Sequence, residues 1–246
     1  MAELEIRNVS FLYEDAHILE NINVHLGDHE LVSLLGESGG GKTTLFNVIA
    51  GLLTPQEGQV LLNGQDITGT SGHVSYMLQK DLLLPYRTIE DNTALPLLLK
   101  GMPKKEARQK VSPYFGEFGL SGTQKKYPHQ LSGGMRQRAA LLRTYMFSGE
   151  VALLDEPFSA LDTLTRQEMH TWYLDVMEKL PLSTLFITHD IDEAILLSDR
   201  IYILGGKPGR ITAEIQVLEK KPRRKDFSLS KEFLDYKREI LGKIGR

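Results

Sequence analysis

The sequence has 246 residues, of which 41% are hydrophobic and 25% are charged, values close to the average for globular proteins. Its 29 basic and 32 acidic residues give a net charge of −3, which does not suggest nucleic-acid binding, and the absence of cysteine excludes disulfides, thiolate metal sites and cysteine nucleophiles. The start shows no cationic stretch followed by an apolar segment, and no apolar run approaches the roughly 18 residues of a spanning helix, so we expect neither a signal peptide nor a membrane span.

The N-terminal third of the chain has the pattern of strands interrupted by turns. The third apolar segment ends in a glycine-rich loop, and residues 43–50 after this loop predict a helix. The β-rich or alternating segments that predict strands are 4–13, 22–26, 30–35, 60–64 and 73–78.

The middle of the chain changes to a helical pattern over about residues 88–147. Buried strands then return, with helical segments between them, at 151–154, 184–188 and 201–204. Strands that alternate with helices predict βαβ units and a mainly parallel sheet, so the helical middle reads as an insertion into an α/β domain. The prolines that punctuate the helical pattern are Pro96, Pro103, Pro113 and Pro128.

Residues 36–43, Gly-Glu-Ser-Gly-Gly-Gly-Lys-Thr, match the phosphate-binding loop pattern G-x-x-x-x-G-K-[ST]. Glycines let backbone N–H groups turn inward around phosphates, Lys42 neutralises phosphate charge during catalysis, and the Thr43 hydroxyl binds Mg²⁺. The alternative is a glycine-rich turn that binds nothing, which the position between a predicted strand and a predicted helix disfavours. The residues expected to bind nucleotide here are Gly36, Glu37, Ser38, Gly39, Gly40, Gly41, Lys42, Thr43 and Thr44.

A second part of a nucleotide site follows the buried strand at 151–154. Asp155 stands at the carboxyl end of this strand, where ligands gather in open α/β sheets, and it is expected to hold Mg²⁺ directly or through water. Glu156 is expected to polarise the attacking water. An apolar run followed by Asp-Glu is a weak signal alone and a strong one when paired with the loop at 36–43.

Residues 131–135, Leu-Ser-Gly-Gly-Met, precede a helix-forming stretch. Ser132 is a good N-cap, and its hydroxyl with the N–H groups of Gly133 and Gly134 would form a second phosphate-sized anion site. An ordinary capped helix is the alternative reading. Since one nucleotide loop does not require two anion sites, a head-to-tail dimer, in which each Ser132 closes over the partner's ATP, accounts for the second site.

With these segments the chain resembles the ATP-binding subunits of ABC transporters over about residues 4–218. The resemblance implies that Tyr13 stacks on adenine, that Gln79 reaches Mg²⁺ and the water, and that His189 contacts the γ-phosphate. It also implies a dimer interface containing Ser132, Gly134 and Asp162. Departures such as Met135, where glutamine is usual, loosen the assignment to a subgroup without removing a phosphate or metal contact.

The resemblance implies an α/β fold of the P-loop NTPase (RecA-like) type. It would have a mainly parallel sheet core, an N-terminal antiparallel β subdomain and a helical subdomain inserted at about residues 84–147. We expect the ABC ATPase domain to cover residues 1–218 and a basic, partly helical tail to cover 219–246. The tail has ten basic and four acidic residues from 220 onward, and its cluster at 220–225 is either a solvated segment or one that approaches an anionic surface.

Four segments look like those of importers for nitrate, sulfonates, taurine or the pyrimidine precursor of thiamine: residues 131–138, 156–162, 188–190 and 207–211. We therefore expect the ATP-hydrolysing subunit of a bacterial importer, with ATP and Mg²⁺, at the cytoplasmic face of the cell membrane. The implied partners are two membrane-spanning permease subunits, a solute-binding protein and a second copy of this chain, with no nucleic acid. Residues 84–88 fall where the family docks a helix of the membrane subunit, or they form a surface turn.

Two other classes of protein remain as alternatives. One is a soluble ABC-type ATPase in DNA repair or translation, but this chain has neither the long coiled-coil insertion nor the second module of those proteins. The other is a P-loop kinase, which leaves residues 131–135 unexplained.

Overall fold

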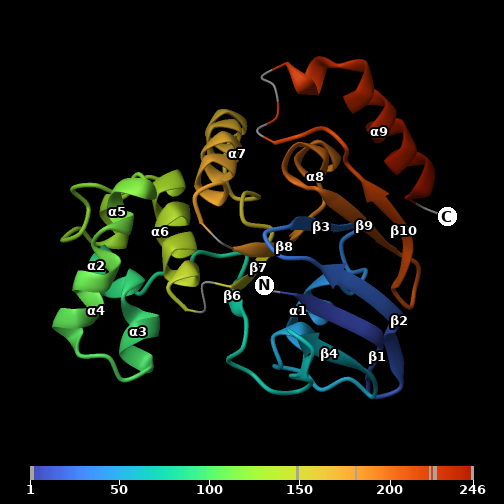
Figure 1. Cartoon of the computed structure of the whole chain (residues 1–246), viewed down its shortest axis with the longest axis horizontal. Helices are drawn as coiled ribbons and strands as arrows, with labels where there is room; N and C mark the ends of the chain where they lie inside the picture. The colour runs from blue at the N-terminus through green and yellow to red at the C-terminus, as the bar shows by residue number, and fades with distance from the viewer. Residues whose placement is uncertain (1–2, 148–149, 181, 222, 224–225, 245–246) are drawn as a thin grey trace.

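Two β-sheets form the frame of the fold in the computed structural model, which describes residues 3–147, 150–180, 182–221, 223 and 226–244 (Figure 1). The first sheet is antiparallel, with the order β2-β1-β4-β5, and the second has the order β10-β9-β3-β8-β7-β6. The strands of the first sheet are β1 (Leu4–Tyr13), β2 (Ala16–Leu26), β4 (Glu57–Leu62) and β5 (Gln65–Asp66). Those of the second are β3 (Leu31–Gly36), β6 (Ser75–Met77), β7 (Val151–Asp155), β8 (Ser183–Thr188), β9 (Arg200–Gly205) and β10 (Arg210–Gln216).

The second sheet is parallel except for its edge pair, β9 and β10. Every residue of β3, β7 and β8 is buried, as expected for parallel strands covered on both faces. Because β6, β7, β8 and β3 run in one direction, their carboxyl ends lie along one edge of the sheet. Residues that follow these strands are therefore brought together there.

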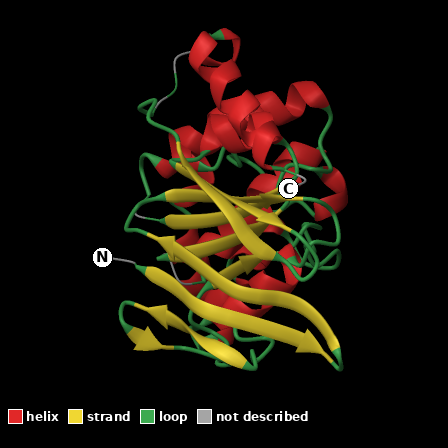
Figure 2. Cartoon of the chain, turned by 90° about the vertical axis from the view of Figure 1, so that its right-hand side faces the viewer, coloured by secondary structure: helices red, strands yellow, loops and turns green. Residues whose placement is uncertain are grey.

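Helices cover the parallel sheet and form a separate group beside it. In Figure 1 the helices from α2 to α6 lie together on one side of the molecule, while α9 lies at the opposite side. Figure 2 shows the strands of both sheets in the middle and lower parts of the view, with several helices above them. The helices flanking the sheets are α1 (Lys42–Ile49), α7 (Thr163–Met177), α8 (Ile191–Leu197), η2 (Phe227–Leu229) and α9 (Lys231–Lys243). The separate group contains α2 (Ile89–Thr93), α3 (Leu95–Leu99), α4 (Lys104–Val111), α5 (Tyr114–Glu117), η1 (Pro128–Gln130) and α6 (Gly133–Tyr145).

The prolines of the helical region each stand at the start of a helix. Pro96 and Pro128 occupy the first turn of α3 and η1, and Pro103 and Pro113 are the N-cap residues of α4 and α5. Proline suits these positions because its missing N–H group has no intrahelical partner there. The pattern at 88–147 therefore corresponds to several short helices and the longer α6.

One predicted strand begins and ends earlier than its pattern indicates. The segment expected at 60–64 forms β4, which ends at Leu62, because Asn63 and Gly64 both have positive φ angles, 52° and 75°. Two consecutive left-handed residues make the tight turn that joins antiparallel strands, here β4 and β5.

The C-terminal segment packs on the sheet domain. Phe233 and Ile240 on the inner side of α9 are buried in a core with α8 and β9. Lys221 forms an ion pair of 2.7 Å with Asp199, and the Arg223 guanidinium donates to the Ser198 carbonyl. The prediction that the cluster at 220–225 is solvated or approaches an anionic surface is thus wrong for Lys221 and Arg223, which bind residues of the same chain. Positions 222, 224 and 225 lie outside the described residues. Within the described part of the chain, no helix has the length and apolar character needed to cross a bilayer.

Candidate nucleotide site

The glycine-rich loop at 36–43 joins β3 to α1. Gly41 is the N-cap of α1 and has a φ of 95°, and a Cβ atom built there would lie 2.8 Å from the Leu19 side chain. A Cβ atom on Gly36 would lie 2.5 Å from the Leu204 carbonyl oxygen. Both positions therefore require glycine, the first for its backbone conformation and the second for the close approach of β9.

Lys42 lies beneath this loop, and only 6% of its surface is exposed. Its Nζ atom donates to the carbonyl oxygens of Gly36 at 2.8 Å and Glu37 at 2.7 Å. Burial lowers the pKa of Lys42, and the nearby carboxylates of Glu156 and Asp155 oppose this shift. These two hydrogen bonds tie the Lys42 ammonium group to the first two residues of the loop.

Glu156, which follows β7, lies between one side chain that follows β6 and one that follows β8, the two strands on either side of β7. Its Oε2 atom accepts from Gln79 Nε2 at 3.0 Å, and its Oε1 atom lies 3.2 Å from His189 Nδ1. The Glu156 backbone has a φ of 46°, a left-handed conformation that is unusual for a residue other than glycine, and its N–H group donates to the Ile187 carbonyl of β8. The strand order β8-β7-β6 therefore places the three groups in one cluster.

A cavity of about 450 Å³ opens between the loop and this cluster. Asp155 lies at its floor, where its Oδ2 atom accepts a hydrogen bond of 3.1 Å from the Thr43 hydroxyl. Glu37 and Gly40 face a different hollow beside Ile244. The residues that line the cavity are Ile18, Ser38, Gly39, Gly41, Lys42, Thr43, Thr44, Gln79, Asp155, Glu156 and His189.

The oxygen atoms of Thr43, Asp155 and Gln79 fit a magnesium ion that is bound together with nucleotide phosphates. Among the described residues, no group of three or more His, Cys, Asp or Glu side chains is placed to hold a metal by itself. Mg²⁺ commonly uses one or two carboxylates and the phosphates of its substrate, so a single buried carboxylate beside a hydroxyl is a suitable donor set.

Asp155 is predicted to reduce the stability of the nucleotide-free protein at neutral pH. Burial raises its pKa despite the Thr43 hydrogen bond and the Lys42 charge, so its ionised form is less favourable in the folded than in the unfolded chain. Asp155→Asn should therefore raise the melting temperature at pH 7–8, by roughly 2–4 °C for each kcal/mol gained. The gain should shrink as the pH falls through the raised pKa of Asp155 in the folded protein, and it should be small near the unfolded-state pKa of about 4. Thermal unfolding from pH 4 to 8 tests this, and a lower melting temperature at pH 8 would contradict it.

Five predicted residues that do not belong to the glycine-rich loop lie outside the cavity. Tyr13 is at the end of β1, 47% exposed, with its ring edge-on to Phe11. Ser132 caps α6 by accepting from Met135 N at 3.3 Å, and Gly133 follows it, exposed, while Gly134 is buried. Asp162 caps α7 and accepts from Thr165 N at 3.1 Å.

Two neighbours of the site were not singled out from the sequence. Ile18, which directly precedes the buried Leu19 on β2, lines the cavity. The Tyr76 hydroxyl on β6 is buried, and burial together with the Asp155 charge raises its pKa. A tyrosine between Ser75 and Met77 in a buried strand is the only signal of this position in the sequence.

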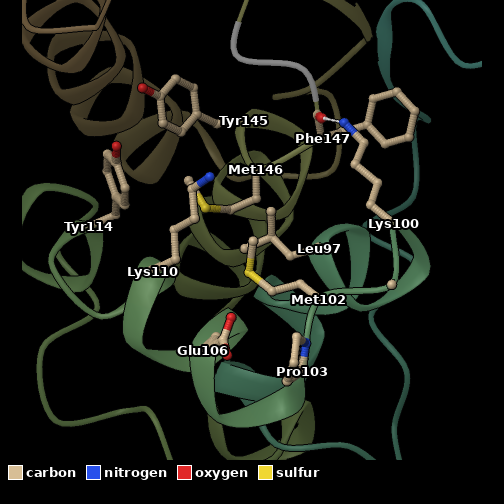
Figure 3. Close-up of a pocket in the computed structure, with 11 residues that line it drawn as sticks. Leu97, Lys100, Met102, Pro103, Glu106, Lys110, Tyr114, Tyr145, Met146 and Phe147 are labelled. Carbon is tan, nitrogen blue, oxygen red and sulfur yellow. Dashed lines mark hydrogen bonds between the residues drawn. The ribbon is translucent and has the colours of Figure 1, made fainter.

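A second hollow of about 550 Å³ lies between the α3–α4 turn and the end of α6 (Figure 3). Its apolar lining includes Leu97, Met102 and Met146, and the Lys100 ammonium beside it donates to the Phe147 carbonyl. We call this hollow the helical groove. Its residues are Leu97, Lys100, Gly101, Met102, Pro103, Glu106, Lys110, Tyr114, Tyr145, Met146 and Phe147.

The segment after Gln79 is tied to the helix that borders the helical groove. Arg143 of α6 donates to the carbonyl oxygens of Asp81 and Leu82. Tyr86, a few residues further on, is 73% exposed, and Leu99 of α3 is 78% exposed. Large exposed apolar side chains are typical of a surface that contacts a partner.

Comparison with known proteins identifies the family. The model of the ABC transporter family matches residues 19–159. The formylaminopyrimidine import ATP-binding protein ThiZ of Halalkalibacterium halodurans is 44% identical over 87% of this chain and 84% of that protein. The chain belongs to the ABC transporter family. The nitrate import ATP-binding protein NrtD of Synechocystis is 38% identical over 90% of this chain and 86% of that protein. The aliphatic sulfonates import ATP-binding protein SsuB of Bacillus cereus is 40% identical over 91% of this chain and 87% of that protein.

Solved structures of ABC transporter cassettes agree with this assignment. A dimeric bacterial cassette superposes with a TM-score of 0.74 and 28% identity, over 87% of this chain and 98% of that chain. A dimeric post-hydrolysis state with bound ADP and phosphate gives a TM-score of 0.72 at the same identity and coverage. The predicted P-loop NTPase fold is confirmed, and the chain is an ABC-type ATPase.

Proposed function

We propose that this ATPase is the energy-supplying subunit of a bacterial importer for a small solute. The observation that carries the proposal is the cluster of Gln79, Glu156 and His189 beside the phosphate-binding loop. A carboxylate held by two polar side chains next to the place of the terminal phosphate is suited to hydrolysis, since it can accept a proton from water.

Each residue of the cavity would have a different role in ATP hydrolysis. The backbone N–H groups of the glycine-rich loop and Lys42 would bind and neutralise the phosphates. Glu156 would take the proton of the attacking water, and His189 would contact the γ-phosphate and keep the Glu156 carboxylate in position. Mg²⁺, held by Thr43, Asp155 and Gln79, would neutralise charge that develops on the phosphate oxygens.

Two copies of the chain would hold two ATP molecules between them in a head-to-tail pair. Ser132 and Gly133 are exposed at the positive end of α6 and lie outside the cavity of their own chain. An anion site that does not face its own nucleotide is explained when it faces the partner's nucleotide. Gly134 and Asp162, which starts α7, would belong to the same interface, while Tyr13 would stack on adenine.

The helical groove, together with residues 84–88, would bind a short helix of a permease subunit. Apolar side chains line the floor of the helical groove, and Lys110 and Glu106 stand at its rim, so an amphipathic helix suits it better than a polar loop. The contacted segment begins at Leu84, five residues after Gln79. A shift of the docked helix would thereby reach the nucleotide site.

Relatives that are import proteins for formylaminopyrimidine, nitrate and aliphatic sulfonates support a small solute of one of these kinds. We place the chain at the cytoplasmic face of the cell membrane, working with two permease subunits and a solute-binding protein.

Uptake measurements in the native host test this function. Deletion of the gene should reduce uptake of one of the three solutes to background, and the wild-type gene should restore it. The Tyr86→Ser gene should not restore uptake, although the isolated variant should hydrolyse ATP at a rate within about twofold of wild type because Tyr86 lies outside the nucleotide cavity. Unchanged uptake of all three solutes after deletion would contradict the proposal.

A further inference from the structure

The helices α7 and α8 each begin just after a residue with a proposed role in ATP hydrolysis, and these two roles differ. The helix α7 begins after Asp162, which would face the partner subunit, and α8 begins two residues after His189, which lines the cavity of its own chain. Hydrolysis in a shared site needs both groups in place at once, so the connection between α7 and α8 is relevant to catalysis.

A buried pair of side chains joins these helices. His170 Nε2 of α7 lies 2.8 Å from Glu193 Oε1 of α8, and the two side chains are 11% and 6% exposed. A carboxylate removed from water is costly unless it is paired and hydrogen-bonded, and His170 supplies this partner. The pair therefore fixes one point of α7 to one point of α8.

A second contact lies one turn earlier along α7. Arg166 Nη1 is 3.7 Å from Asp190 Oδ2, and Arg166 Nη2 donates to the Leu161 carbonyl beside Asp162. Asp190 in turn caps α8 by accepting from the backbone of Glu193. This contact is partly exposed and long, so the buried pair is the stronger of the two links.

The pair also touches the segment that carries Glu156. The ring of Phe158, two residues after Glu156, packs edge-on against His170 with centroids 5.0 Å apart. Phe158 makes a similar contact with Tyr173, whose hydroxyl donates to Thr184 of β8. The buried pair thus lies where the segment after β7, the middle of α7 and the start of α8 meet.

We propose that His170 and Glu193 are positioning residues for ATP hydrolysis: their hydrogen bond holds α7 against α8, so that Asp162 and His189 keep one relative position. Movement of the partner subunit at Asp162 is then transmitted to the histidine at the γ-phosphate. This inference rests on the roles proposed above for Asp162 and His189.

Steady-state kinetics of His170 variants test the proposal. His170→Ala should lower kcat by about 10-fold with KM for ATP changed less than about twofold, because small displacements of catalytic groups are costly while the phosphate loop is untouched. His170→Gln, which retains an N–H donor, should recover most of kcat. Val176→Ala removes a buried side chain from the same helix away from the pair, so it should lower the melting temperature with near wild-type kcat.

Wild-type kcat in His170→Ala would overturn the proposal, as would equal losses of kcat in His170→Ala, His170→Gln and Val176→Ala. If His170→Ala does not fold, the double variant His170→Leu/Glu193→Leu replaces both partners with apolar groups and leaves no buried charge unpaired. It should show the same loss of kcat, and wild-type kcat in it would also overturn the proposal. A His189→Ala protein with normal hydrolysis would instead contradict the proposed function itself.

Discussion

Glu156→Gln should reduce kcat for ATP hydrolysis by about 10²- to 10⁴-fold, the range for loss of a general base, with little change in ATP affinity. The amide has the size of the carboxylate and can still contact Gln79 and His189, which flank the native side chain at 3.0 and 3.2 Å. The amide cannot accept a proton from water, so ATP should bind to the variant without being hydrolysed.

Sedimentation of Glu156→Gln with and without MgATP measures the second consequence. Since ATP would persist between two copies, the variant should be a monomer without nucleotide and a dimer with it. Glu178→Gln, which changes an exposed glutamate at the end of α7, serves as the matched control and should hydrolyse ATP normally. Near-normal hydrolysis by Glu156→Gln would contradict the role of Glu156, and a monomer under both conditions would contradict the proposed pairing of the isolated chains.

Lys42→Ala should weaken ATP binding, in contrast to the change at Glu156. Loss of a charge-assisted contact to phosphate corresponds to about 1.5–3 kcal/mol, or roughly 10- to 150-fold in Kd. The variant also loses the two hydrogen bonds from Lys42 Nζ to the loop carbonyls, so the conformation of the loop should be less well ordered. Loss of the phosphate contact and loss of order in the loop should both raise Kd for ATP.

Calorimetric titration with ATP measures this change directly. Lys110→Ala removes a cation at the helical groove and should leave Kd unchanged, which separates a local effect from the loss of general positive charge. An unchanged Kd in Lys42→Ala would show that the loop backbone alone supplies the binding free energy.

The loop at 36–43 could be predicted because its residues are consecutive and its function depends on their order. The contacts of Glu156 with Gln79 and His189 depend instead on which strands are neighbours. The family resemblance implied that these residues act together, whereas alternating strands and helices do not fix the order β8-β7-β6. The roles of these residues remain predictions.

Long-range pairing also explains what the sequence did not reveal. The cluster at 220–225 resembles a solvated tail because nothing nearby in the sequence indicates that Lys221 pairs with Asp199. Likewise, His170 and Glu193 are unremarkable members of two amphipathic patterns, and only the packing of α7 on α8 joins them. Tyr76 was overlooked because a tyrosine suits a buried strand whether or not its hydroxyl lies near a carboxylate.

The left-handed backbone of Glu156 has a consequence for any attempt to improve this protein by selection. A non-glycine residue in that conformation costs about 1–3 kcal/mol, and glycine would relieve much of this cost. A library screened for heat resistance alone would therefore enrich glycine at position 156 and discard the carboxylate that we propose accepts a proton from the attacking water. Thermostable variants of this cassette should be sought only under a screen that also demands turnover.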